Sequence, residues 1–145
     1  MKRITLENYR TDKYYGRIVQ AVDDILEQSN FVAPVDVFIR MDLLSKEAHD
    51  DWRTGRVPYL EKVLKCNLAK ASRILRILRM HAHDMNLAPS TTTYRRWGKG
   101  KSPPLRFTKT GDAKLEEAYT RHFVNNRQEV SKVSARKGGC QLTSP

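Results

Sequence analysis

The fold is decided by one stretch, which reads NLAKASRILRILRMHAHDMN from Asn67 to Asn86. Its apolar residues recur at spacings of three and four, the period of a helix with one buried face. They are Leu68, Ala71, Leu75, Leu78, Ala82 and Met85, with Ile74 and Ile77 beside them. Basic residues recur every three positions on the other side: Lys70, Arg73, Arg76 and Arg79. We therefore expect a long amphipathic helix with Leu75 and Leu78 in the core and the basic residues facing solvent.

The positive charge of the chain is concentrated in and after this helix. Between Lys65 and Lys109 there are eleven basic residues and one acid, Asp84, which gives a local balance of +10. Residues 1–64 have a balance of −1 and residues 110–145 one of +2, out of +11 for the whole chain. A regional excess of this kind favours a polyanionic partner. The alternative is a solvated surface that serves only solubility.

Length and composition indicate the broad class of protein. A chain of 145 residues is typical of one domain. No apolar run approaches the roughly 18–20 residues that cross a bilayer, and no apolar segment of a secretory signal follows the basic start Met1-Lys2-Arg3. Two cysteines, Cys66 and Cys140, do not make a disulfide framework. We expect a cytoplasmic protein without a membrane partner.

The residues before the long helix are predicted to form shorter helices that pack against it. The expected helices span residues 12–28, 35–43, 46–54 and 59–64. Ser45 is a good N-cap for the third, Gly55 a natural end for it, and Pro58 a suitable start for the fourth. We expect the centre of the core at Trp52, Val57, Tyr59, Leu60, Val63 and Leu64.

Residues 91–109, after the long helix, favour a β-hairpin. Residues 91–97 are rich in β-branched and aromatic side chains, 98–104 have the glycine and proline of a loop, and 105–109 alternate apolar and polar residues. The alternative is an extended arm without paired strands. The basic residues of this segment are Arg95, Arg96, Lys99, Lys101, Arg106 and Lys109. A basic hairpin after a basic helix is the arrangement of a winged helix.

The rest of the chain is predicted to be one more helix and a tail. Asp112 is a candidate N-cap for a helix over residues 113–124. Residues 126–145 lose the apolar period and are expected to form a flexible basic tail. The domain organisation is therefore a single helical domain over residues 1–125, with its hairpin at about 91–109, followed by this tail.

Two local resemblances concern the segment before the long helix. The stretch from Asp42 to Glu61 resembles the second half of a repressor-type helix-turn-helix of the Cro family, in which a serine caps the recognition helix and a glycine and a proline follow it. This resemblance implies DNA binding. Residues 52–119 look like a group of small basic bacterial proteins of unknown function, with the signature WRTGRVPYLE at residues 52–61. That second resemblance implies no activity.

Few residues are candidates for metal binding, catalysis or base stacking. His81 and His83 point about 200° apart on a helix, so they cannot share a metal. The chain has no C-x-x-C pair, glycine-rich phosphate loop or nucleophile elbow, and Cys66 is expected to be a buried free thiol. Trp97 and Tyr94 either stack on a base or pack on the long helix, and packing is the favoured interpretation. We expect no catalytic residue, metal or cofactor.

The sequence as a whole predicts a mainly α protein, a compact helical domain with a helix-turn-helix-like segment and one β-hairpin, similar to a winged helix. Its expected function is to bind nucleic acid, DNA rather than RNA, as a transcriptional regulator does. The predicted phosphate contacts are Lys70, Arg73, Arg76, Arg79, Arg95, Arg96, Lys99, Lys101, Arg106 and Lys109. The alternative is a protein-interaction module, or a subunit of a larger assembly, that binds an acidic protein partner. A third interpretation, a small nucleic-acid enzyme, would rest on His81, His83 and Asp84.

Overall fold

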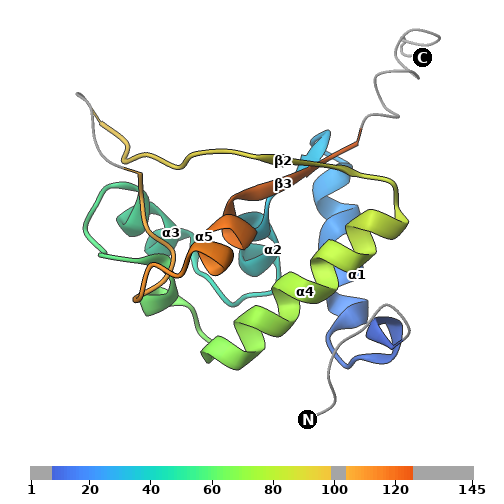
Figure 1. The fold of residues 1–145 in the computed structure, drawn as a ribbon. Helices are drawn as coiled ribbons and strands as arrows, with labels where there is room; N and C mark the ends of the chain where they lie inside the picture. The colour runs from blue at the N-terminus through green and yellow to red at the C-terminus, as the bar shows by residue number, and fades with distance from the viewer. Residues whose placement is uncertain (1–7, 99–103, 126–145) are drawn as a thin grey trace, which may run out of the picture.

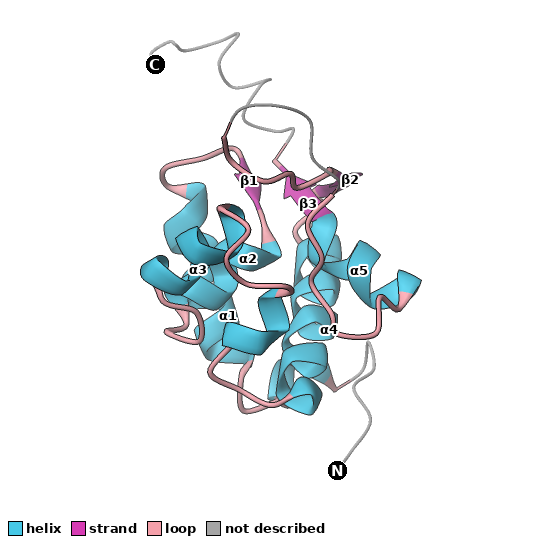
Figure 2. Ribbon diagram, turned by 90° about the vertical axis from the view of Figure 1, so that its left-hand side faces the viewer, coloured by secondary structure: helices cyan, strands magenta, loops and turns pink. Residues whose placement is uncertain are grey.

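Residues 8–98 and 104–125 are described by a computed structural model, and most of them are helical. The helices are α1 (Tyr15–Leu26), α2 (Pro34–Arg40), α3 (Lys46–Arg53), α4 (Leu68–Asp84) and α5 (Ala113–Thr120), with 3₁₀ turns η1 (Tyr9–Thr11) and η2 (Leu60–Val63). Three strands, β1 (Phe31–Val32), β2 (Ala88–Thr91) and β3 (Arg121–Val124), form an antiparallel sheet along one edge of the helical body (Figures 1 and 2). The prediction of a mainly helical fold is confirmed.

The long helix α4 follows its sequence pattern closely. The side chain of Asn67 caps its first turn by accepting a hydrogen bond from the Lys70 N–H at 2.8 Å. Leu75 and Leu78 are buried, as their spacing predicts. Leu68 is an exception, because it is the first residue of the helix and 59% of it is exposed. The buried face of α4 therefore begins one turn later than the apolar pattern does, at Ala71.

The first three of the earlier helices are confirmed but are shorter than predicted. Ser45 caps α3 by accepting from the Ala48 N–H at 3.0 Å, and Gly55 lies beyond its end with φ +84°, as a helix-ending glycine should. The predicted helix 35–43 ends at Arg40 because Asp42 adopts a left-handed conformation with φ +61°. Residues predicted as a fourth helix form only the 3₁₀ turn η2.

The predicted helix over residues 113–124 is wrong in its last four residues. α5 stops at Thr120, and Arg121–Val124 form the central strand β3. β3 pairs with β2 on one side and with β1 on the other, with Phe123 opposite Pro89 and Val32. Hydrogen bonds to two neighbouring strands satisfy the backbone of these residues, and that tertiary pairing outweighs their local helical pattern.

The two limbs of the predicted hairpin meet at one point in the described residues. Arg95 and Pro104 form an isolated bridge, beside a 2.7 Å hydrogen bond from the Leu105 N–H to the Tyr94 carbonyl. The predicted strand over 91–97 is wrong except at Thr91, which is the last residue of β2 (Ala88–Thr91), a strand that pairs with β3. The limb at 105–109 is held by η2, because the carbonyls of residues 106 and 107 accept from the N–H groups of residues 60 and 61. The loop tip at 99–103 and the predicted tail at 126–145 lie outside the described residues.

An aromatic cluster fixes these limbs to the helices. The Trp52 ring of α3 lies 5.0 Å from the Phe107 ring and 5.6 Å from the Tyr94 ring, while Phe107 stacks on Tyr119 of α5 at 5.1 Å. The Trp52 indole N–H also donates to the Arg106 carbonyl at 2.8 Å. Trp52 and Leu60 are core residues as predicted, whereas the other four expected at the core centre are half-buried: Val57, Tyr59, Val63 and Leu64.

Within residues 8–98 and 104–125, no helix has the length and apolar character to cross a membrane.

His81 is a buried histidine whose titration should make the stability of the fold depend on pH. The buried ring lies 5.8 Å from the Tyr15 ring of α1, and its Nε2 has no hydrogen-bond partner among the described residues. Burial lowers the pKa of His81 from its ordinary 6.5, while Asp23 opposes this shift and Arg10 adds to it. Below about pH 6.5 the unfolded chain therefore takes up a proton that the folded chain resists. The unfolding free energy should be largest above this pH and fall as the pH drops below it.

We expect a His81→Leu variant to lose part of this dependence, because leucine fills a similar space and does not titrate. Denaturant unfolding at about pH 7.5 and about pH 5.5 measures the difference in free energy. The control is His83→Leu, since the His83 side chain is 82% exposed. His122, whose pKa burial also lowers, should leave some residual slope. Equal pH dependence in the parent and the His81 variant would contradict the assignment.

Candidate nucleic-acid interface

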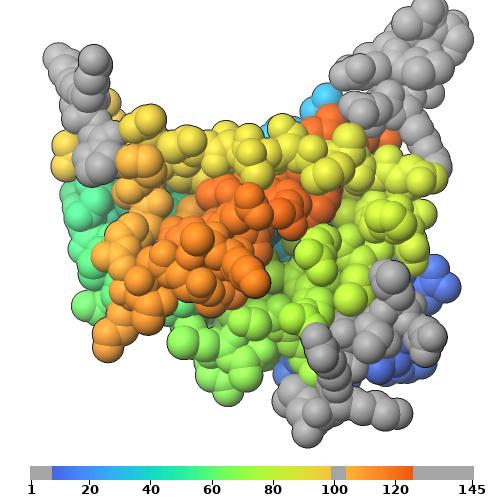
Figure 3. Space-filling model, viewed as in Figure 1, coloured from blue at the N-terminus to red at the C-terminus, as the bar shows by residue number. Residues whose placement is uncertain are grey.

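A cleft of about 550 Å³ separates α4 from α5. Figure 3 shows it as a hollow between the orange surface of α5 and the green surface of α4. Its floor is apolar, with Leu75 and Leu78 from α4 and Pro34 from the start of α2. The elements that line the cleft are thus brought together by the core itself, since the same helix face that packs inward forms the floor.

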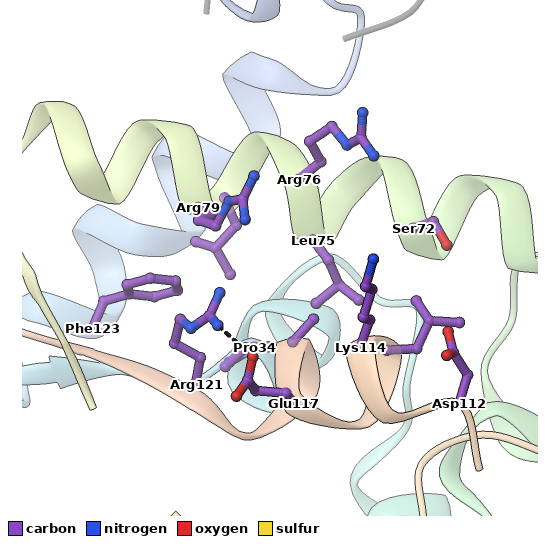
Figure 4. A pocket seen from close by; sticks show the side chains of 13 residues that line it. Pro34, Ser72, Leu75, Arg76, Arg79, Asp112, Lys114, Glu117, Arg121 and Phe123 are labelled. Atoms are coloured by element: carbon purple, nitrogen blue, oxygen red, sulfur yellow. Dashed lines mark hydrogen bonds and ion pairs between the residues drawn. The ribbon is translucent and has the colours of Figure 1, made fainter. Parts of the chain in front are cut away.

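Four basic residues from three elements line this cleft. Arg76 and Arg79 project from α4, Lys114 from α5, and Arg121 from the first position of β3 (Figure 4). Arg76, Arg79 and Lys114 are exposed, whereas Arg121 is half-buried and pairs with Glu117 at 2.9 Å. Two acids, Asp112 and Glu117, also line the cleft, so the balance of its lining is +2. A hollow with several guanidinium groups is suited to phosphate or carboxylate oxygens, which arginine binds through two parallel hydrogen bonds.

A second, more apolar hollow of about 440 Å³ adjoins the first. Both are lined by Arg79, Arg121 and Phe123. The second hollow adds Met80 and His83 of α4 with Leu87 and Pro89, and therefore reaches to the sheet. Together the two form a groove along α4, with the pair Arg79 and Arg121 at its middle.

The basic face of α4 divides into two parts that the sequence did not distinguish. Arg73 forms an ion pair with Asp12, and their side chains are only 16% and 1% exposed. Lys70 is half-buried and holds its ammonium 4.9 Å from the centre of the Tyr14 ring. Only Arg76 and Arg79, one and two turns further on, line the cleft. The expectation that all four face solvent is therefore wrong for Arg73, which has a structural contact.

The basic residues predicted on the hairpin also differ in their surroundings. Arg95 and Arg96 are exposed beside the bridge, and Lys109 is exposed on the other limb. Arg106 is exposed, but its guanidinium donates to the carbonyls of residues 108 and 109 and so closes that turn. Lys99 and Lys101 lie outside the described residues.

Lys114 and Arg121 were not among the predicted phosphate contacts. In the sequence they are separated by seven positions, two helical turns, with Glu117 between them. That spacing on a predicted helix would have placed all three on one polar face. The acids in this segment lowered its net charge, so its basic residues did not stand out in the sequence.

The surface of α3 differs in charge from this cleft. Glu47 is exposed, Asp50 contacts Lys46 at 3.4 Å and the His49 ring at 2.9 Å, and Asp51 contacts Arg56 at 3.4 Å. The hydrogen bond to His49 lowers the pKa of Asp50, so this carboxylate is ionised at neutral pH. Phosphate approaching α3 would meet like charge, which makes the α4–α5 cleft the better anion site.

The described residues offer little for metal binding or catalysis. None of their His, Cys, Asp and Glu side chains form groups of three that could hold a metal ion. His81 is buried and His83 exposed, so the two do point apart. Burial raises the pKa of the half-buried Cys66 thiol, which disfavours the reactive thiolate. Searches of protein-family models, curated proteins and solved structures found no match to this chain.

We expect the free energy of unfolding of an Arg73→Ala variant to be about 2–3 kcal/mol lower than that of the parent. The substitution leaves the Asp12 carboxylate buried without its cation. Thermal or denaturant melts of the purified variant measure this loss. The matched control is Arg76→Ala, three residues further on and exposed, which should stay within about 0.5 kcal/mol. Equal losses in both variants would show that Arg73 has no special structural contact.

Proposed function

We propose that this protein binds nucleic acid, with the phosphate backbone held in the α4–α5 cleft by Arg76, Arg79, Lys114 and Arg121. The observation that carries the proposal is that these four cations, from three elements, all line one hollow. DNA rather than RNA is the proposed form, from the resemblance of residues 42–61 to a repressor-type helix-turn-helix.

Electrostatics support a polyanion rather than a single small anion. The exposed cations continue beyond the cleft to Arg95 and Arg96, on the segment that leaves β2. Repeated phosphates along a backbone can occupy several such positions at once, and each contact releases counterions and adds affinity. These contacts carry no base information, so the proposal predicts similar affinity for different sequences.

A wing-like role for residues 94–107 belongs to the same proposal. What supports it is the bridge between Arg95 and Pro104, which holds the two limbs together at the edge of the body. The resemblance of residues 42–61 supports DNA as the ligand, but α3 is acidic, so in this proposal α4 and this segment, rather than α3, contact the DNA.

Replacing Arg76 and Arg79 together with alanine tests the proposal. Loss of two phosphate contacts should weaken oligonucleotide binding about 25- to 60-fold at about 0.1 M salt, because each contact contributes roughly 0.7–0.9 to the salt slope of log K. Fluorescence anisotropy with a labelled oligonucleotide measures the change. Stability should be nearly unaltered, since both side chains are exposed.

The control is a double variant of Lys46 and Arg56 to alanine, which removes the same charge from the region of α3. Their side chains are 71% and 76% exposed and pair with acids. It should bind almost as the parent does. If both double variants lose the same affinity, binding reflects net charge rather than the cleft. If the parent binds no nucleic acid even at low salt, the acidic protein partner becomes the better interpretation.

A further inference from the structure

Trp97 is an exposed aromatic residue with arginine side chains close to it. It is 45% exposed, and the other exposed large hydrophobic side chain among the described residues is Leu68. Of the two roles considered from the sequence, packing takes place on α3, where the His49 ring and the Arg53 guanidinium lie beside Trp97. A single exposed hydrophobic residue is common on protein surfaces, so the case for a ligand rests on the side chains around this one.

The indole is held in place rather than left to rotate. The Trp97 backbone N–H donates to the Arg53 carbonyl at 2.7 Å, and the His49 ring packs edge-on against the indole at 5.8 Å. The Arg53 guanidinium lies 5.0 Å from the centre of the Trp97 ring and 5.1 Å from that of Tyr94. Contacts of this kind restrict the ring, so the Trp97 side chain has less entropy to lose when a ligand binds.

The cations beside the indole outnumber the one acid described near it, Asp50, which is hydrogen-bonded to the His49 ring, and they favour one class of partner. Arg53 lies against the ring, and Arg95 and Arg96 immediately precede it and are exposed. The side chain of Arg96 packs at Gly55, where an added Cβ would lie 2.7 Å from its Cδ. Three arginines around one exposed aromatic ring match a ligand that alternates flat rings with negative charges.

We propose that Trp97 is a stacking platform for an unpaired nucleobase of single-stranded nucleic acid, with neighbouring phosphates on Arg95 and Arg96. The proposal rests on the proposed function and adds the form of the ligand. Bases within a duplex are stacked on each other and cannot present a face to Trp97, whereas a single strand can.

The chain path connects this platform to the cleft. Thr91, the last residue of β2, is paired with Arg121 of the cleft, and Trp97 follows six residues later. Figure 1 shows the yellow segment after β2 running extended across the body toward α3. A strand lying along this segment would contact the cleft at one end and Trp97 at the other, within the roughly 4–16 nucleotides that single-strand binding sites usually cover.

The chain has two tryptophans, which makes a direct test simple. Trp52 is 0% exposed, so a ligand that stacks on the surface should quench only Trp97. We expect oligo-dT to quench the intrinsic fluorescence of the parent protein but not that of Trp97→Phe. The phenylalanine variant should still bind labelled oligo-dT by anisotropy, because phenylalanine also stacks.

An abasic oligonucleotide of the same length separates stacking from charge, since it has the phosphates without the bases. Trp97→Ala should weaken oligo-dT binding about 5- to 150-fold and leave abasic binding unchanged. The proposal is overturned if Trp97→Ala affects both ligands equally or neither, or if oligo-dT does not quench the parent. If the parent binds abasic, oligo-dT and duplex ligands alike, only the stacking proposal fails. If it binds none of them, the proposed function fails as well.

Discussion

A Trp52→Ala variant is expected to lose about 3–5 kcal/mol of unfolding free energy, a large share of the roughly 5–15 kcal/mol available to a domain. The Trp52 side chain is fully buried and contacts rings from two separate segments, those of Tyr94 and Phe107. Alanine would leave a cavity between α3 and both limbs, and would remove the indole hydrogen bond to the Arg106 carbonyl. The variant should therefore melt far below the parent.

The chain's second tryptophan provides the control for this loss. Trp97→Ala removes the same atoms from a half-open position, so its cost should be well under half that of Trp52→Ala. Differential scanning calorimetry of the two variants gives the comparison. Similar melting temperatures for the two would show that Trp52 is not the centre of the aromatic cluster.

A Glu116→Ala variant is expected to lose about 3 kcal/mol of unfolding free energy. The Glu116 carboxylate of α5 accepts hydrogen bonds from the N–H groups of Phe107 and Thr108 and, at 2.6 Å, from the Thr108 hydroxyl. Both partner residues are buried, so alanine would leave their N–H groups without an acceptor, at about 1–3 kcal/mol each. Together with the stack of Phe107 on Tyr119, this carboxylate attaches the limb at 105–109 to α5.

The next residue provides a matched control. Glu117 is exposed and makes one surface ion pair, with Arg121, so Glu117→Ala should cost no more than about 1 kcal/mol. Urea unfolding of both variants measures the free energies. A loss in Glu116→Ala no larger than that in Glu117→Ala would contradict the role of Glu116 as the anchor of this limb.

The parts of the fold that local sequence determines were predictable. α4 has a regular apolar period and α3 has a capping serine and a terminal glycine, and each signal acts within a few residues. β3 was not predictable in this way, because its strand conformation depends on pairing with β1 and β2, which lie far from it in the sequence. The same holds for residues 105–109, whose partners are η2 and Glu116.

The candidate site was predictable only in part, for a similar reason. The period of α4 identified Arg76 and Arg79, but nothing local indicates that Arg73, on the same face, meets Asp12. Lys114 and Arg121 join the site only because α5 and β3 pack beside α4. The exposure of Trp97 likewise follows from its contacts with α3, which the sequence around it does not specify.

The most direct test of a nucleic-acid surface in the α4–α5 cleft is the salt dependence of binding, measured for the parent and the Arg76→Ala, Arg79→Ala double variant. If three to six phosphates are held, log K for the parent should fall linearly with log salt, with a slope of roughly −3 to −5. The double variant should have a slope shallower by about 1.4 on a single strand or about 1.8 on duplex DNA. An unchanged slope in the variant, or no binding by the parent at low salt, would contradict the account.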